Sequence, residues 1–404
     1  MNARGKQRGI TLVVIAIAMI AIVAIAGLAI DIGRLVGDKA RLQATVDAAA
    51  LTAAKVLDTT GSTASATTAA NAAFAINVAQ QRELAGAPGA VTVDFSNTPE
   101  PFAPGSAPPL YARVSANGFT VAATFSHVLG FNTFPLTASA TAGPSPTLRN
   151  ACNLAPMMVC GTPPTGAAPV YGYSVGQVTA LQLSSGTPAT LAPGYFLQQA
   201  AGGNTQDQDY AGGYAACSTI GTTDQAQTGI APGAVAQGLD TRFNEYIAGD
   251  VNSATYPPDV ITNQPAGNRL ACTSPTCATI VSGGNVITNA SQIPDNSYEG
   301  MYQPNLLAGN YDNPPAPGGN GVVDRRVLAV PVGDCAAAAP GNNNVPVLGL
   351  ACMFMLQDVD PAAGQVFAEV ISNCQVNGNP GPVPNNGPGP YSIQLYHVTG
   401  STQS

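Results

Sequence analysis

One serine has the sequence context of a catalytic nucleophile. Gly172-Tyr173-Ser174-Val175-Gly176 matches G-x-S-x-G, the nucleophile elbow of the α/β-hydrolases. The elbow requires a strand before the serine and a helix directly after it, whereas residues 177–183 alternate as a strand does. His397 is the only histidine that follows Ser174 in the chain. We therefore expect a chance match, with a membrane-tethered periplasmic serine hydrolase that uses Ser174 as the alternative function.

The chain shows no convincing metal pattern. It has no C-x-x-C, and its two histidines, His127 and His397, are not near a cysteine in sequence. Asp94-Phe95-Ser96 begins like a von Willebrand-type metal motif, but Thr98 stands where the second serine is needed. The stretch 312–324 is rich in Asp, Asn and Gly but lacks EF-hand spacing. We expect a strand end and a solvated loop there, with no metal, no other cofactor and no small-molecule substrate.

The cysteines have the distribution of a disulfide framework. All eight lie beyond residue 143, in the part that we place outside the cytoplasm, and their even number favours disulfides. Cys272 and Cys277 are close enough for a local bridge, and the other pairings stay open. The candidates are Cys152, Cys160, Cys217, Cys272, Cys277, Cys335, Cys352 and Cys374.

The elements that position these residues begin with an apolar segment at 10–30, which carries no charged residue. Its length matches the roughly 30 Å hydrocarbon core of a bilayer, so we predict a transmembrane helix in which Ile15 and Ile22 contact the membrane or a partner helix. Basic residues in the tail 1–9 keep that end in the cytoplasm and place the rest outside it. The alternative is cleavage after the small-x-small sequence Ala24-Ile25-Ala26, which would release a soluble exported adhesin.

The helical pattern continues past the membrane as a stalk. Its apolar stripe has helical spacing and consists of Leu35, Leu42, Val46, Ala49 and Ala53. The stripe packs either on the chain's own globular domain or on partner helices in an assembly, and the sequence leaves both open. Asp31, at the membrane edge, either pairs with the positive N-terminus of a partner or is solvated at the interface.

The remaining pattern predicts an α+β protein. We expect a second helix at 67–84, short strands at 91–95, 110–116, 119–125 and 134–142, and a hairpin turn at Asn117-Gly118. A Gly-Pro boundary then separates the stalk helix and a small α+β domain, 31–143, from a β-rich, loop-rich, disulfide-containing domain, 144–404. Expected elements of this distal domain are a helix at 232–246 and core strands at 327–332, 345–356, 365–371 and 391–398.

The composition restricts the function classes. Charged residues make up 9% of the chain, against about 25% in typical proteins, and the net charge is −8. Such neutral polar surfaces are common in exported proteins and cell appendages. No basic patch interleaved with aromatic residues follows the first 55 positions, so nucleic-acid binding is not expected.

The N-terminus resembles the TadE/TadG-like proteins of the tight-adherence (Flp) pilus assembly system of bacteria. Three segments carry the likeness: Arg8-Gly9, the exit GLAIDIGR at 27–34, and the stalk with RLQ at 41–43 and DAAAL at 47–51. The segment 119–143 is similar to the end of the family's first periplasmic domain. GLDTRFNEY at 238–246 and RRVLAVPVGDC at 325–335 are similar, more loosely, to longer members.

The resemblance implies a non-enzymatic, minor-pilin-like assembly component of a Flp pilus. It would be anchored in the bacterial inner membrane with a periplasmic body, would contact pilins or other pilus-assembly proteins, and would support adhesion. The fifth residue after Gly9 is Val14, whereas prepilin-type processing goes with glutamate there. No von Willebrand-type domain is evident, so metal-dependent adhesion is not implied.

Overall fold

The structure is a computed structural model that describes residues 8–397, except 82–83, 85–88, 184–193, 200–204, 228–230, 248–249, 265–268, 275–276, 339–342, 363, 377 and 381–387. The chain forms two compact units, which we call unit 1 (Met1–Pro144 with Ile393–Ser404) and unit 2 (Ser145–Ser392). Unit 2 is therefore inserted between two parts of unit 1. Helices and several antiparallel sheets are both present, which confirms the predicted α+β class.

Unit 1 is built on one long helix, α1 (Arg8–Thr60). Its 53 residues contain no proline, and at about 1.5 Å per residue they extend roughly 80 Å. The helix ends where Gly61 adopts a positive φ of 61° and its N–H bonds to the carbonyl of Leu57. A second helix, α2 (Thr63–Ala79), begins directly after Ser62, whose hydroxyl accepts from the N–H of Ser65. The second helix, expected at 67–84, thus begins and ends earlier in the chain than predicted.

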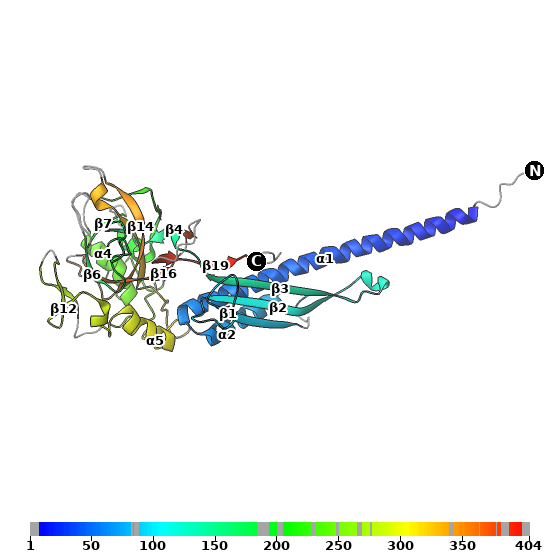
Figure 1. The fold of residues 1–404 in the computed structure, drawn as a ribbon, viewed down its shortest axis with the longest axis horizontal. Coiled ribbons are helices and arrows are strands. Elements are labelled where there is room, and N and C mark those ends of the chain that lie inside the picture. Colours follow the sequence, from blue (N-terminus) through cyan, green and yellow to red (C-terminus); the bar gives the residue numbers. More distant parts are fainter. Residues whose placement is uncertain are drawn as a thin grey trace, which may run out of the picture. The chain divides into compact units, whose positions relative to one another are not determined.

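A four-stranded antiparallel sheet lies along the C-terminal part of α1 (Figure 1). Its order is β1 (Ala90–Ser96), β2 (Tyr111–Ala122), β3 (Thr133–Pro144) and β19 (Ile393–Tyr396). We expected 391–398 to form part of the distal core. The structure corrects this, because β19 pairs with β3 in unit 1, with Ile393 opposite Pro144.

Asn117-Gly118 is not a hairpin turn. Both residues lie inside β2, at a shift in the pairing register with β3 between Ala116 and Phe119. Gly118 has a φ of 74°, which a β-bulge can require as much as a turn does. The hairpin turn lies further on, at residues 123–132 between β2 and β3, and contains a 3₁₀ helix, Ser126–Leu129. We call residues 123–132 the tip loop.

Alanines dominate the core of unit 1. One face of α1 packs on β2, β3 and α2, and small side chains on both sides allow close approach of helix and sheet. Phe74 of α2 and Phe119 of β2 fill the remaining space, with ring centroids 5.8 Å apart. The fully buried alanines are Ala49, Ala50, Ala53, Ala70, Ala112, Ala116 and Ala142.

Six strands of unit 2 pair into a closed ring. The order is β13 (Val327–Gly333), β5 (Met157–Cys160), β7 (Tyr195–Gln198), β6 (Val178–Leu183), β15 (Val366–Ile371) and β14 (Asn344–Met355), and β14 pairs back to β13. All six strands contribute to one buried cluster, so this cluster fills the interior of the ring. Helix α4 (Pro232–Leu239) and the 3₁₀ helix Asp240–Phe243 that continues it add Val235, Leu239 and Phe243 to it.

The other face of the ring is covered by loops and short elements. The helix there is α5 (Gln303–Ala308), preceded by a π-helical turn, Tyr298–Tyr302, whereas α3 (Gln206–Gly212) packs on α4 and adds Tyr210 to the interior cluster. The short strands are β4 (Leu148–Leu154), β8 (Tyr214–Thr219), β9 (Thr223–Gln225), β10 (Ala271–Cys272), β11 (Ile280–Ser282), β12 (Asn285–Ile287), β16 (Asn373–Gln375), β17 (Gly378–Pro380) and β18 (Gly389–Tyr391).

All eight cysteines are paired, which confirms the predicted disulfide framework. The bridge between Cys272 and Cys277 is the local one that their spacing predicted. The other three bridges are Cys152–Cys217, Cys160–Cys335 and Cys352–Cys374.

Candidate membrane and assembly segment

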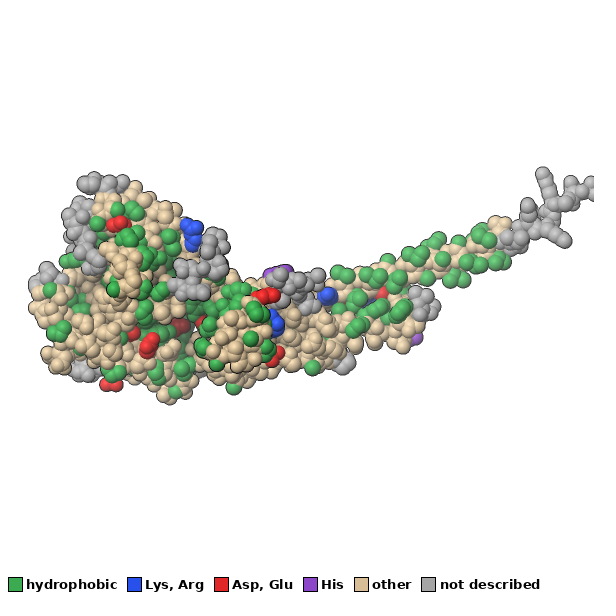
Figure 2. Space-filling view, viewed as in Figure 1, with side chains coloured by type: hydrophobic (Ala, Val, Ile, Leu, Met, Phe, Trp, Pro, Cys, Tyr) green, Lys and Arg blue, Asp and Glu red, His purple; other side chains and the backbone are tan. Residues whose placement is uncertain are grey.

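The first half of α1 exposes its apolar side chains on all sides. Ile15 and Ile22, predicted to contact the membrane or a partner helix, are 54% and 66% exposed. Figure 2 shows hydrophobic side chains along this part of the helix, with no Lys, Arg, Asp or Glu among them. Within the described part of the chain, α1 is the one helix that is long enough and apolar enough to cross a membrane. An exposed apolar surface of this extent is typical of segments that contact a membrane or another protein.

The stalk stripe lies against the chain's own sheet. Leu42, Val46, Ala49 and Ala53 are fully buried in the core of unit 1, and Leu35 is half-buried beside them. The sequence left open whether the stripe packs on its own domain or on partner helices. In the structure Leu42, Val46, Ala49 and Ala53 pack on the chain's own domain, whereas Leu35 keeps part of its side chain exposed.

Asp31 is buried between α1 and the tip loop. Its Oδ1 accepts from the N–H of Thr124 at 3.2 Å, and its Oδ2 accepts from the N–H groups of Phe125 and Ser126 at 2.9 and 2.6 Å. Burial raises the pKa of Asp31, but these hydrogen bonds outweigh burial and lower the pKa below its usual value. Asp31 is therefore an ionised anchor for the tip loop rather than a solvated side chain.

Two basic residues strengthen the same region of α1. Arg34 donates through Nη1 to the hydroxyl of Thr124 and so makes a second link to the tip loop. One turn further along, Arg41 pairs with Oδ1 of the buried Asp38 at 3.2 Å. The side chains of Asp31 and Arg34 thus join the tip loop to α1.

Ser174 lacks the surroundings of a nucleophile. Its hydroxyl donates to the carbonyl of Ala167, and the segment that follows is strand β6 rather than a helix. Tyr173, directly before it, is buried and donates to the carbonyl of Cys160. The sequence of unit 2 contains no histidine that could act as a base. The G-x-S-x-G segment therefore serves here as a turn that leads into the ring of strands.

Sequence analysis missed a buried arginine cluster in unit 2. Arg326 is fully buried, with its guanidinium between the rings of Phe243 and Phe354, 4.7 and 4.6 Å from their centroids. It donates to the carbonyls of Met355, Leu356 and Ile261. Burial lowers its pKa to about 10, so it stays protonated.

The carboxylate of Asp259 completes this cluster. Asp259 accepts from the hydroxyl of Tyr302 and from the backbone N–H of Arg326, at 2.9 and 2.8 Å. The cluster joins the segments 238–246 and 325–335, the two distal segments that had drawn the looser family resemblance. The residue types of these two segments drew the resemblance, but only the fold shows that the segments contact each other. Because every one of these polar groups is occupied within the protein, the cluster holds structure rather than substrate.

No group of three or more His, Cys, Asp or Glu residues in the described part of the chain is placed to hold a metal ion. The described pockets of unit 2 are open and lined mainly by polar side chains of loops and strands. One of them, lined by the π-helical turn and β15, contains the buried carboxyl of Glu369. Serine hydroxyls and the carboxyl of Glu369 line the same pocket.

Comparison with known proteins gave one match. Residues 9–56 match the Flp pilus-assembly TadE/G-like family, and this range coincides with most of α1. No curated protein and no solved structure matches the chain. The matched range joins the exposed apolar half of α1, Asp31 and the buried stripe in one continuous helix. Residues 9–56 are thus similar to the TadE/G-like proteins of Flp pilus assembly, as the resemblance of the N-terminus predicted.

Proposed function

We propose that the protein is a structural, minor-pilin-like component of a Flp-type pilus assembly system. In this proposal, α1 crosses the bacterial inner membrane once and holds the body in the periplasm, where it supports pilus biogenesis and adhesion. Its partners are the membrane and other pilus-assembly proteins or pilins. The observation that carries the proposal is the coincidence of the family match at 9–56 with a helix whose first half is exposed and apolar.

The charges on the two sides of the apolar segment support the orientation. Arg4, Lys6 and Arg8 precede it, and such residues are retained on the cytoplasmic side. The four disulfides all lie on the other side of the segment, in unit 2. Because disulfides form and persist in oxidising compartments, this distribution favours a periplasmic body.

The contacts of the candidate reactive groups are compatible with the structural role that we propose. Ser174 is held in a turn and hydrogen-bonds a backbone carbonyl. The buried Arg326 and Asp259 have their polar groups occupied by the protein itself. Serine-reactive fluorophosphonate labelling that was saturable and lost in Ser174→Ala would contradict this part of the proposal.

The anchor and the pilus role are tested together by complementation. A strain that lacks the protein is supplied either with the full chain or with a chain whose residues 10–30 are replaced by a cleavable export signal. We expect the full chain to restore pili, counted by electron microscopy, and the released body to restore none, because the body is no longer held at the assembly site.

Topology is measured in the same strains. Protease added to intact spheroplasts should digest the cysteine-containing part of the full chain, and only detergent should extract the protein from membranes. Wild-type pilus numbers with the released body would overturn the role of the anchor. Protection of the body from external protease would overturn the orientation.

A further inference from the structure

The tip loop is an apolar turn on an otherwise polar domain. Its sequence, ATFSHVLGFN at 123–132, contains no Asp, Glu, Lys or Arg. Phe125 and Phe131 are 48% and 56% exposed, and the ring of Phe131 stacks on that of Phe134 with centroids 6.4 Å apart. Loop tips are ordinarily polar because they face water, so two exposed aromatic rings here need an explanation.

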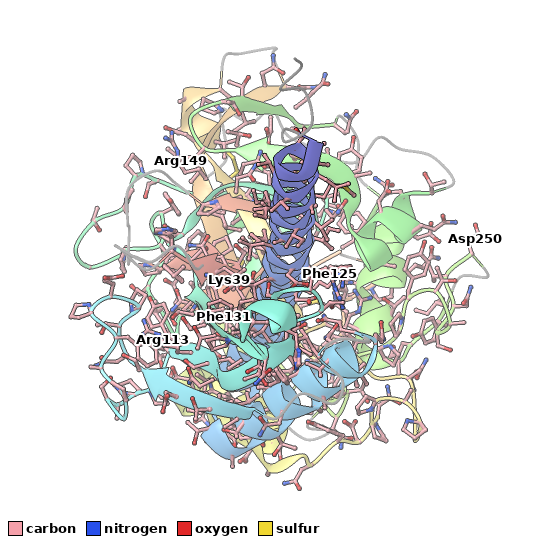
Figure 3. The ribbon with its side chains drawn as sticks, turned by 90° about the vertical axis from the view of Figure 1, so that its right-hand side faces the viewer. Lys39, Arg113, Phe125, Phe131, Arg149 and Asp250 are labelled. Carbon is pink, nitrogen blue, oxygen red and sulfur yellow. A yellow bond between two sulfur atoms is a disulfide. The ribbon has the colours of Figure 1, made fainter. Side chains whose placement is uncertain are left out.

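The loop contacts α1 at a residue of the apolar segment. A Cβ added to Gly27 would lie only 2.7 Å from Cβ of Phe125, so the side chain of Phe125 lies directly on the backbone of Gly27. Figures 1 and 3 show the tip loop beside α1, and Figure 3 labels Phe125 and Phe131. Gly27 precedes Ile30, the last residue of the uncharged run, by about 4.5 Å along the axis.

The backbone of the loop is prepared for a nonaqueous environment. The N–H groups of Thr124, Phe125 and Ser126 donate to Asp31, and that of Phe131 donates to the carbonyl of Ser126. The N–H of Ala123 donates to the carbonyl of Asn132. An unpaired amide is costly where lipid replaces water, and these hydrogen bonds lower that cost for the amides named.

We infer that the tip loop is a second membrane contact, whose two phenylalanines enter the outer lipid interface beside α1 and set the height of unit 1 above the bilayer. The inference rests on the proposed function, because it requires α1 to cross the membrane. The occupant follows from continuity with that segment: a ring seated on Gly27 lies at the depth of the acyl-chain boundary. Aromatic rings are favoured at such interfaces.

The protein contains no tryptophan, so single tryptophans report on their positions without background. The variants are Phe125→Trp and Phe131→Trp in the loop, and Ile17→Trp in the apolar half of α1. Ile76→Trp on α2, where the native side chain is 61% exposed, is the control away from the loop. Each full chain is reconstituted into three kinds of phosphatidylcholine vesicles: unbrominated, with acyl chains brominated near the headgroup, and with acyl chains brominated deeper in the bilayer.

We expect blue-shifted emission and loss of intensity in brominated vesicles for both loop variants. Ile17→Trp should lose intensity with lipid brominated deeper in the acyl chain, and Ile76→Trp should lose none. Quenching of Ile17→Trp alone would overturn the inference and leave the membrane span standing. No quenching of Ile17→Trp would overturn the proposed anchor and the inference together.

Two further outcomes would also count against a lipid contact. Quenching of Ile76→Trp as strong as that of the loop variants would mean that the whole surface of unit 1 lies on lipid. Protection of the loop variants from aqueous iodide, without quenching by bromolipid, would mean that a protein surface such as a second copy of the chain covers the loop.

Discussion

At the scale of single residues, unit 2 contains a carboxyl group whose environment disfavours its charge. Glu369 lies in β15 between β14 and β6 and is 3% exposed. The pKa of Glu369 is raised to about 7. Burial is the largest cause, the charge of Glu299 acts in the same direction, and the hydrogen bond from the N–H of Tyr298 to Oε2 acts against them. Glu369 therefore ionises in the folded protein near neutral pH, well above the pH at which it ionises in the unfolded chain.

This pKa makes the stability of unit 2 depend on pH. The folded protein favours the protonated form of Glu369, because its folded pKa is raised. Unit 2 therefore keeps its full stability below the unfolded pKa of about 4.5 and loses this part of its stability as pH rises through about 7. We expect the free energy of unfolding to fall between pH 5 and 8, with a contribution from Glu369 on the order of 2–3 kcal/mol.

The variant Glu369→Gln should flatten this pH dependence and be the more stable form at pH 8. Glutamine keeps an acceptor for the N–H of Tyr298 and carries no charge. Thermal unfolding of the detergent-solubilised chain at the two pH values measures the effect. Glu299→Gln is the matched control, because Glu299 is more exposed and should change the slope less. Equal slopes in the wild type and in Glu369→Gln would contradict the assignment.

At the scale of elements, one helix has two environments. Residues before Asp31 are exposed and apolar, whereas the stripe from Leu42 onward is buried against the sheet of unit 1. A charge placed in this stripe has no water and no partner, which costs several kcal/mol. Typical domains are stable by only about 5–15 kcal/mol.

Leu42→Asp should therefore unfold unit 1 while leaving the chain in the membrane. We expect rapid proteolysis of residues 63–144, retention of the chain in the membrane fraction, and loss of pili. Val36→Asp, at a position that is 63% exposed on the same helix, should leave unit 1 protease-resistant. A folded unit 1 with normal protease resistance in Leu42→Asp would contradict the packing described here.

Local patterns predicted the elements that depend on neighbouring residues. The helical stripe, the second helix, the bridge Cys272–Cys277 and the three distal strands β13, β14 and β15 all follow from spacing or composition. The hairpin turn predicted at Asn117-Gly118 was wrong, because a glycine with positive φ is compatible with a β-bulge as well as with a turn. The sequence could not decide which surface the stripe meets, since a helix on its own sheet and a helix on a partner need the same pattern.

Contacts between distant residues could not be predicted. Asp31 accepts hydrogen bonds from residues more than 90 positions away, and no local signal marks Thr124, Phe125 and Ser126 as its donors. The ring of six strands and the position of Arg326 between two aromatic rings likewise depend on the complete fold. The predicted site residues Ile15, Ile22 and Asp31 lie at the membrane segment or its end, but what Asp31 binds is visible only in the structure.

At the scale of the whole molecule, the disulfides close chain segments of very different length. Cys160–Cys335 spans 175 residues, and Cys272–Cys277 spans 5. In the chain-entropy view, a bridge stabilises by restricting the unfolded chain, by about 5 kcal/mol for the long segment and about 2 kcal/mol for the short one. The neighbouring bridge Cys152–Cys217 overlaps the long segment and reduces that difference.

Replacing both cysteines of the long bridge by serine should therefore destabilise unit 2 more than replacing both cysteines of the short one. The expected result is a larger fall in the unfolding temperature for Cys160→Ser with Cys335→Ser than for Cys272→Ser with Cys277→Ser. Differential scanning calorimetry of the purified chain compares them, with free-thiol counts as the control that no bridge has been rearranged. A larger effect of the short bridge would contradict this entropic account.

The insertion of unit 2 fixes an order of events during synthesis. Strand β19 is made after every residue of unit 2, yet it covers β3 with pairs from Ile393–Pro144 to Tyr396–Thr141. Until β19 has been made, the edge of β3 that it covers has unpaired peptide groups that another extended chain could join. A nonsense mutation within unit 2 would remove β19 as well. Such a fragment would combine the apolar half of α1 with an uncovered sheet edge, which favours aggregation.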